Sequence, residues 1–194
     1  MCAGALRTWL QDHHALPDAP LVSMIPVSVR DESTKGALGN RVSAMLAKLP
    51  TNVEDPVERL QLVNEATKVA KAQQATIPQG LVDDISDFAP PALTARAARV
   101  MWATGILHRL PPFNVTISNV PGPRELLYMG GARLDEFYPL SIPTVGQALN
   151  ITVTSYVDRM EFGLTGCRRH VPHLQRLLTH LESSLEALEL AVAA

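Results

Sequence analysis

Charged residues are scarce in this sequence, and basic residues are not in excess. Asp, Glu, Lys and Arg make up 19% of the 194 residues, and the formal net charge is −2. An average soluble domain carries about 25% charged residues. Because 46% of the chain is hydrophobic, the composition excludes a disordered chain, which would have few apolar residues and many charges. Without a basic surplus to neutralise phosphates, no nucleic-acid binding is expected.

Cysteine is almost absent as well. The two cysteines, Cys2 and Cys167, make no disulfide framework, which favours a reducing compartment. No apolar stretch reaches the roughly 18 residues needed to span a bilayer. The first residues also lack the basic segment of a secretory signal. We therefore expect a cytoplasmic protein that is not secreted, with peripheral contact to a membrane or lipid droplet left open.

Three common site motifs are missing too. The sequence contains no G-x-x-x-x-G-K-[ST], no G-x-G-x-x-G and no G-x-S-x-G. Nucleoside triphosphate binding, dinucleotide binding and an esterase-type nucleophile therefore have no motif in their support.

Apolar periodicity and breaker residues predict one domain, residues 1–194, of alternating helices and strands. The clearest helix start is the capping box from Asp55 to Glu58, with Pro56 at the first helical position. Helices are predicted over residues 2–12, 56–74, 80–88 and 90–107 and from Pro172 onward. Strands are predicted over 21–30, 40–49 (where Ala and Met also permit helix), 113–120, 132–137, 149–157 and 160–165. This order is typical of an α/β or α+β fold with a mixed sheet flanked by helices.

Two helices carry apolar stripes that predict core contacts. Helix 56–74 has apolar residues every three to four positions, and the final helix has a stripe of leucines. The stripes consist of Val57, Leu60, Val63, Ala66, Val69 and Ala70, and of Leu174, Leu177, Leu178, Leu181, Leu185 and Leu188. Helix 2–12 has no capping residue ahead of it, which suggests that it belongs to a longer chain.

Residues 13–18 spell H-H-x-x-x-D, the pattern of a general base in one acyltransferase superfamily. That superfamily's motif continues with glycine, but Ala19 stands here, and Pro17 and Pro20 place the segment in a connection between helix and strand. We interpret the segment as a solvated loop and keep His14 only as a weak catalytic candidate.

A second set of residues has the chemistry of metal ligands. Cys167, His170, His173 and His180 bear thiol and imidazole groups, but their spacing fits no familiar structural zinc site. Exposed histidines on a helix are the simpler interpretation, and we expect no metal.

Residues 114–123 read as a strand that ends in a rigid Pro-Gly-Pro turn. Alternation places Asn114, Thr116 and Ser118 on one face and Asn119 on the other. Such side chains could line a polar site or donate to an oxyanion. A half-buried strand whose polar side meets solvent explains the same pattern.

A series of short motifs resembles, in order and spacing, the C-terminal half of the bacterial wax ester synthase/diacylglycerol acyltransferase family. The similarity covers nearly the whole chain. The motifs are residues 2–7 (CAGALR), 16–18 (LPD), 26–30 (PVSVR), 39–43 (GNRVS), 49–50 (LP), 55–60 (DPVERL), 114–115 (NV), 118–123 (SNVPGP) and 149–151 (LNI).

The resemblance implies one half of a two-domain fold similar to chloramphenicol acetyltransferase, with a tunnel between the halves. It implies transfer of a fatty acyl group from the co-substrate acyl-coenzyme A to diacylglycerol or a long-chain alcohol, without a bound cofactor. The family's H-H-x-x-x-D-G base would precede Met1, so the chain alone is expected to be inactive. Supporting residues facing the tunnel are expected to be Thr116, Ser118, Asn119 and Asn150.

The sequence departs from the family pattern at two places. Cys167 stands where the family often has aspartate, and His173 follows Pro172 where the family usually has aspartate. A histidine is a weaker choice than aspartate near a helix N-terminus. Expected partners are the N-terminal acyltransferase half or a second copy of the chain. The alternative function is a non-catalytic module that binds lipid or protein through the face that the other half would cover.

Overall fold

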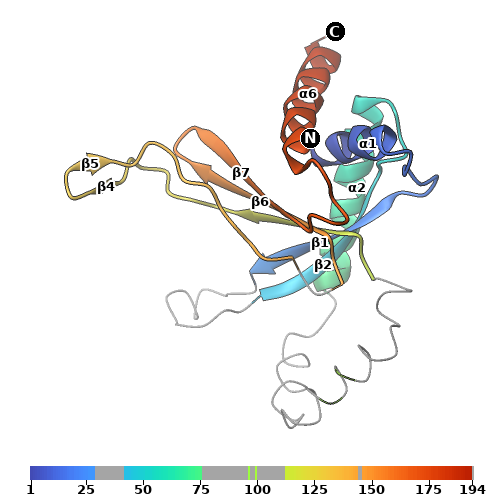
Figure 1. Cartoon of the computed structure of the whole chain (residues 1–194), viewed down its shortest axis with the longest axis horizontal. Coiled ribbons are helices and arrows are strands. Elements are labelled where there is room, and N and C mark those ends of the chain that lie inside the picture. The colour runs from blue at the N-terminus through green and yellow to red at the C-terminus, as the bar shows by residue number, and fades with distance from the viewer. Residues whose placement is uncertain (29–41, 76–95, 97–98, 100–111, 144–145, 194) are drawn as a thin grey trace.

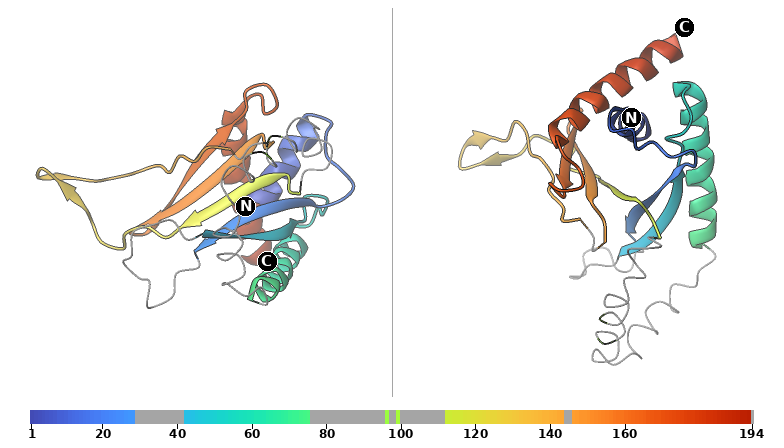
Figure 2. Two further views of the ribbon diagram at one scale, coloured as in Figure 1. Left: turned by 90° about the horizontal axis from the view of Figure 1, so that it is seen from below. Right: turned by 45° about the vertical axis from the view of Figure 1, so that its right-hand side comes forward.

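A computed structural model describes residues 1–28, 42–75, 96, 99, 112–143 and 146–193. It has a five-stranded mixed sheet with α1, α2 and α6 on one face (Figures 1 and 2). The elements are α1 (Cys2–Asp12), β1 (Leu21–Ser28), β2 (Val42–Leu49), α2 (Pro56–Ala75), β3 (Val115–Val120), β4 (Tyr128–Met129), β5 (Ala132–Arg133), β6 (Leu149–Tyr156), β7 (Arg159–Gly166) and α6 (Leu174–Ala193). The helices predicted over 80–88 and 90–107 lie outside the described residues, apart from the helical Arg96 and Arg99.

The strands run in the order β2-β1-β3-β6-β7. The central pairs β1/β3 and β3/β6 are parallel, and the outer pairs β1/β2 and β6/β7 are antiparallel. The tight connection predicted after residue 157 is present, with Tyr156 paired to Arg159 and Val157 at a φ of 55°. The prediction of a mixed sheet flanked by helices is confirmed.

The strand predicted over residues 132–137 is wrong in extent, because only Ala132–Arg133 form β5. Gly130 and Gly131 have φ values of 57° and 84° and turn the chain back, so that β5 pairs with β4. The pairing ends where the N–H of Leu134 donates to the Leu127 carbonyl (2.8 Å). This small hairpin projects away from the five-stranded sheet (Figure 1). We call residues 124–143 the arm.

The core lies between the helices and the sheet, and α1 occupies the space between α2 and α6 (Figure 2, right). Ala5, Ile151 and Leu177 are fully buried there. Helix α1 contributes the buried residues Ala3, Gly4, Ala5, Leu6 and Trp9 to this core. None of the helices in the described ranges combines the length and the hydropathy that crossing a bilayer requires.

The two predicted apolar stripes, on α2 and α6, are buried only in part. On α2, Ala70 is buried, but Leu60 and Val69 are 46% and 57% exposed. On α6, Leu177 and Leu181 are buried, whereas Leu178 is 43% exposed. On α6, Leu178 lies off the face that packs against α1, whereas Leu60 on α2 borders an open pocket between the helices and the sheet.

Candidate functional site

The sheet face opposite the helices is lined by polar side chains. Strand alternation turns Ile117, Ile151 and Val153 towards the helices and their even-numbered neighbours away from them. In the register, Thr116 pairs with Asn150 and Ser118 with Thr152. We call this set of side chains the polar face; it consists of Thr116, Ser118, Asn150, Thr152 and Thr154. Ser118 is half-buried, whereas the other four are almost fully buried at 2–4% exposure.

Hydrogen bonds satisfy most of the polar face. The Thr152 hydroxyl donates to Asn150 Oδ1 (2.9 Å), and the Thr154 hydroxyl donates to the Val120 carbonyl (2.9 Å). Asn150 Nδ2 donates over 3.4 Å to the carbonyl of Ile142 in the arm. The buried hydroxyl of Thr116 has no hydrogen-bond partner among the described residues. An unpaired buried hydroxyl costs about 1–3 kcal/mol, which makes Thr116 an exception among the buried polar groups of this face.

The arm is fastened to the β6–β7 pair through Tyr156. Its hydroxyl donates to the Leu134 carbonyl (2.7 Å) and accepts the N–H of Leu127 (3.0 Å). The ring of Phe137 meets the ring of Tyr156 edge-on at 5.5 Å. Farther along, the arm crosses β7 on the same side of the sheet as the polar face. It lies so close that a Cβ on Gly163 would be 1.6 Å from the Pro139 carbonyl oxygen. One tyrosine and one glycine thus fix how the arm lies over the sheet.

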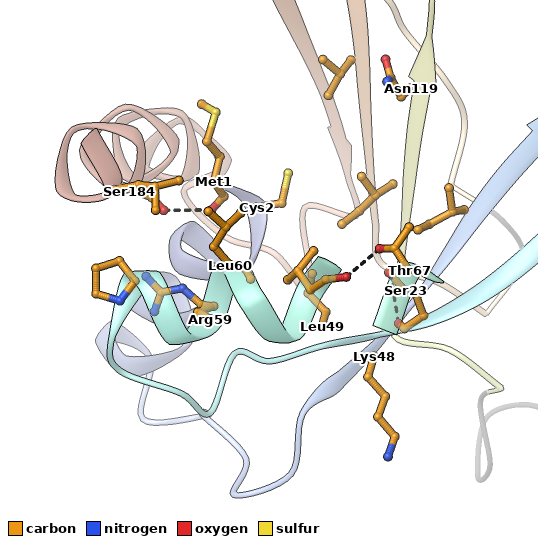
Figure 3. A pocket seen from close by; sticks show the side chains of 18 of the residues that line it. Met1, Cys2, Ser23, Lys48, Leu49, Arg59, Leu60, Thr67, Asn119 and Ser184 are labelled. Carbon is orange, nitrogen blue, oxygen red and sulfur yellow. Dashed lines mark hydrogen bonds between the residues drawn. The ribbon is translucent and has the colours of Figure 1, made fainter. Parts of the chain in front are cut away.

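The structure separates two of the predicted tunnel residues. Ser118 belongs to the polar face, whereas Asn119 points to the helix side of the sheet, as Figure 3 shows. Asn114 serves the fold, because its Oδ1 accepts the N–H of Val22 (2.7 Å). After the strand, the N–H of Gly122 donates to Ser155 Oγ (3.1 Å). Thr116, Ser118 and Asn150 therefore come together, and Asn119 does not join them.

An apolar pocket of about 360 Å³ lies between the helices and the sheet (Figure 3). Arg59 and Ser184 lie towards one end and Asn119 towards the other. The Arg59 guanidinium donates to the carbonyls of Val53 (2.9 Å) and Glu54 (3.2 Å), while burial and the nearby Arg7 lower its pKa. The Ser184 hydroxyl donates to the Met1 carbonyl (3.0 Å). The pocket is apolar in its body and presents no nucleophile paired with a base.

The H-H-x-x-x-D segment begins in the turn that ends α1. The N–H of His14 donates to the Gln11 carbonyl (3.0 Å) and the N–H of Ala15 to the Leu10 carbonyl (2.9 Å). With its φ of 51°, His14 is the left-handed residue of a Schellman cap. His13 stacks on Trp9 and donates from Nδ1 to that residue's carbonyl (2.7 Å). The backbone of His14 and the imidazole of His13 thus both take part in the end of α1.

The four residues with metal-ligand chemistry are not gathered at one point. Cys167 Sγ lies 3.3 Å from His170 Nδ1. His180 Nε2 lies 3.2 Å from Asp12 Oδ2 and so links α6 to α1. His173 is exposed and has a left-handed φ of 54°. Within the described ranges, no group of three or more His, Cys, Asp or Glu side chains could hold a metal ion.

Comparisons with known proteins converge on one family. A probable diacylglycerol O-acyltransferase from Mycobacterium tuberculosis is 48% identical over 193 residues, 99% of this chain and 41% of that protein. The O-acyltransferase WSD of Acinetobacter baylyi is 40% identical over 193 residues, 100% of this chain and 41% of that protein. The chain thus spans about two fifths of the length of the curated relatives it matches.

Solved structures agree with the sequence comparisons. The wax ester synthase/diacylglycerol acyltransferase from Marinobacter aquaeolei VT8 matches with a TM-score of 0.78 and 40% identity, over 100% of this chain and 42% of that one. The first condensation domain of the CDA synthetase matches at a TM-score of 0.50 and 16% identity, over 97% of this chain and 38% of that one. That second likeness shows the fold alone, which is of the chloramphenicol acetyltransferase-like type. Since the model of the WS/DGAT C-terminal domain family also matches residues 38–189, the chain belongs to that family.

Proposed function

We propose that this chain is the C-terminal half of an O-acyltransferase that moves a fatty acyl group from acyl-coenzyme A to diacylglycerol or a long-chain alcohol. The observation that carries the proposal is the match over the whole chain to proteins named for these activities, together with a TM-score of 0.78. The chemistry of acyl transfer needs a general base, which the relatives' additional length would supply.

The polar face is the part of this half that meets substrate. Thr116, Ser118 and Asn150 present hydroxyl and amide groups from neighbouring strands, and the free hydroxyl of Thr116 supports a role in binding an ester or thioester oxygen. Rigid strands are suited to this, because preorganised donors stabilise developing charge without reorganising. Asn119 lies on the helix side, where it lines the apolar pocket.

The exposed apolar side chains of the arm favour an interface with a partner domain. Its apolar side chains at Met129, Leu140 and Ile142 are 84%, 81% and 87% exposed. An exposed apolar patch of this kind marks an interface or an aggregation hazard. We assign it to docking of the N-terminal acyltransferase half, with self-association as the substitute when that half is absent.

The chain by itself is expected to show no acyl transfer, because the H-H-x-x-x-D-G base of the family is not among its residues. Mixing it with the separately expressed N-terminal half of the Mycobacterium tuberculosis relative is expected to restore turnover of acyl-coenzyme A and diacylglycerol. Coenzyme A release and triacylglycerol formation measure the result. A His14→Gly variant keeps the left-handed turn and removes the imidazole, so it should leave the restored activity unchanged. Turnover by the isolated chain that disappears in His14→Gly would contradict the proposal.

Ser118 and Asn119 provide a test of which sheet face meets the substrate. In the reconstituted pair, Ser118→Ala is expected to lower kcat by about tenfold, because a donor near the reacting group is lost. Asn119→Ala, one residue away on the other face, is the matched control and should stay within about twofold. Steady-state kinetics are compared after circular dichroism shows that both variants are folded. A larger loss in Asn119→Ala would place the substrate on the helix side.

The exposed arm also favours a second function, a non-catalytic module that binds protein or lipid. The mixture described above separates the two by size-exclusion chromatography with mass measurement. A stable complex that restores no turnover would favour a protein-binding module, whereas a chain that stays monomeric in the mixture would count against both the reconstituted enzyme and a protein-binding module.

A further inference from the structure

A thiol and an imidazole meet in the turn that follows β7. The Cys167 carbonyl accepts the N–H groups of His170 (2.9 Å) and Val171 (2.8 Å), which folds the chain into a tight turn. This turn brings His170 Nδ1 to 3.3 Å from Cys167 Sγ. The N–H of Cys167 also donates to the Ala148 carbonyl (2.7 Å), so the turn is tied to the start of β6. The backbone of the turn therefore holds the two residues side by side.

The surroundings of Cys167 favour the thiolate. The imidazole of His170 is the titratable group that faces the sulfur, and its hydrogen bond lowers the pKa of the thiol. Hydrogen bonds from the backbone N–H groups of Arg169 and His170 lower it further. Cys167 is partly exposed and His170 is exposed, so small reagents can reach the sulfur. Reactive cysteines occupy electropositive, accessible places of this kind.

Cys2 offers the opposite case within the same chain. It lines the apolar pocket, and burial raises the pKa of its thiol. The two cysteines of the sequence are thus expected to differ strongly in reactivity, although neither is in a disulfide.

We propose that Cys167 is a modification site that exchanges with low-molecular-weight disulfides, with His170 as its positioning residue. The Cys167 thiolate attacks one sulfur of the disulfide, and a new S–S bond forms as the old one breaks. The electron pair of the broken bond leaves on the second sulfur, which takes up the proton released by Cys167. One thiol and one disulfide thus become one mixed disulfide and one thiol, and a reducing thiol reverses the step. This inference does not depend on acyl transfer.

The test measures both cysteines in the wild-type chain at once. Glutathione disulfide is added at pH 7, the reaction is stopped by acid, and tryptic peptides 1–7 and 160–168 report Cys2 and Cys167 separately. A lower thiol pKa raises the thiolate fraction near pH 7 by more than it lowers the nucleophilicity of the thiolate. We therefore expect Cys167 to react severalfold faster than the same cysteine in a free peptide of residues 160–171. Cys2 should remain unmodified.

The free peptide carries the same Arg168 and Arg169, so it controls for local charge and isolates the effect of the folded turn. In His170→Ala, the rate at Cys167 is expected to fall towards that of the peptide, because the imidazole is lost while the backbone N–H groups remain. A second measurement needs no variant: in the wild-type chain, the alkylation rate of Cys167 by iodoacetamide should reach half its maximum at a lower pH than in the peptide. Equal pH profiles, or an unchanged rate in His170→Ala, would overturn the proposal.

Discussion

Replacing Gly163 with alanine is expected to lower the free energy of unfolding by more than about 3 kcal/mol, a large effect for a single methyl group. The added Cβ would lie 1.6 Å from the Pro139 carbonyl oxygen and 2.7 Å from its carbon. Backbone atoms cannot rotate away as a side chain can, so either the arm must lift from β7 or the strand must move. Urea denaturation followed by circular dichroism measures the loss.

Gly166→Ala is the matched control on the same strand. Its Cβ would meet the ends of the Leu174 side chain at 3.2 and 3.4 Å, which a small rotation relieves. The cost there should stay within about 1 kcal/mol. Equal effects of the two substitutions would show that the arm does not cross β7 as described.

Leu177→Ala is expected to cost about 2–5 kcal/mol, because it opens a cavity in the centre of the core. Leu177 is fully buried on α6 and belongs to the same cluster as Leu6, Trp9 and Ile151. The neighbouring atoms come from a helix and a strand whose backbones are fixed, so the cavity can collapse only in part. A lower urea midpoint with an unchanged slope is the expected signature.

Leu178→Ala makes the same chemical change one residue along. Leu178 is 43% exposed, and its loss should cost within about 1 kcal/mol. Similar costs at the two positions would mean that α6 packs with a different face towards α1.

Local signals in the sequence were sufficient for most of the elements. The capping box at Asp55–Glu58 marks the observed start of α2, where the N–H of Glu58 donates to Asp55 Oδ1 (2.7 Å). Alternation predicts β3 and β6, and the two-residue connection before Arg159 predicts the β6–β7 pair. These features depend on residues only a few positions apart, so they can be predicted from the sequence.

Which stripe residues are buried is not a local property. Leu60 and Leu178 both fit the helical periodicity, yet Leu60 borders an open pocket and Leu178 lies off the face of α6 that packs against α1. The extent of β5 likewise depends on where the chain separates from β4, after the turn at the glycine pair 130–131. Periodicity predicts which face of each element is apolar, while tertiary packing decides how much of that face is buried.

The candidate site was predictable in part. Thr116, Ser118 and Asn150 were identified and lie together on the polar face, but Asn119 was grouped with them although alternation assigns it to the other side. Thr152 and Thr154 were missed, and the polar alternation of residues 150–154 was the signal for them. The role of Tyr156 had no local signal, because its two partners lie 29 and 22 residues away.

The central place of β3 has a consequence for how the chain reaches this structure. The antiparallel pairs β1–β2 and β6–β7 join neighbouring strands, whereas β3 joins them through partners that are distant in sequence. Asn114 and Val22 are 92 residues apart, and Thr154 and Val120 are 34 apart. Contacts that close long loops form slowly, because the entropy of closure precedes the gain from pairing. We therefore expect insertion of β3 to be the slow step of refolding, and the strand edges that it leaves unpaired until then to be open to other chains.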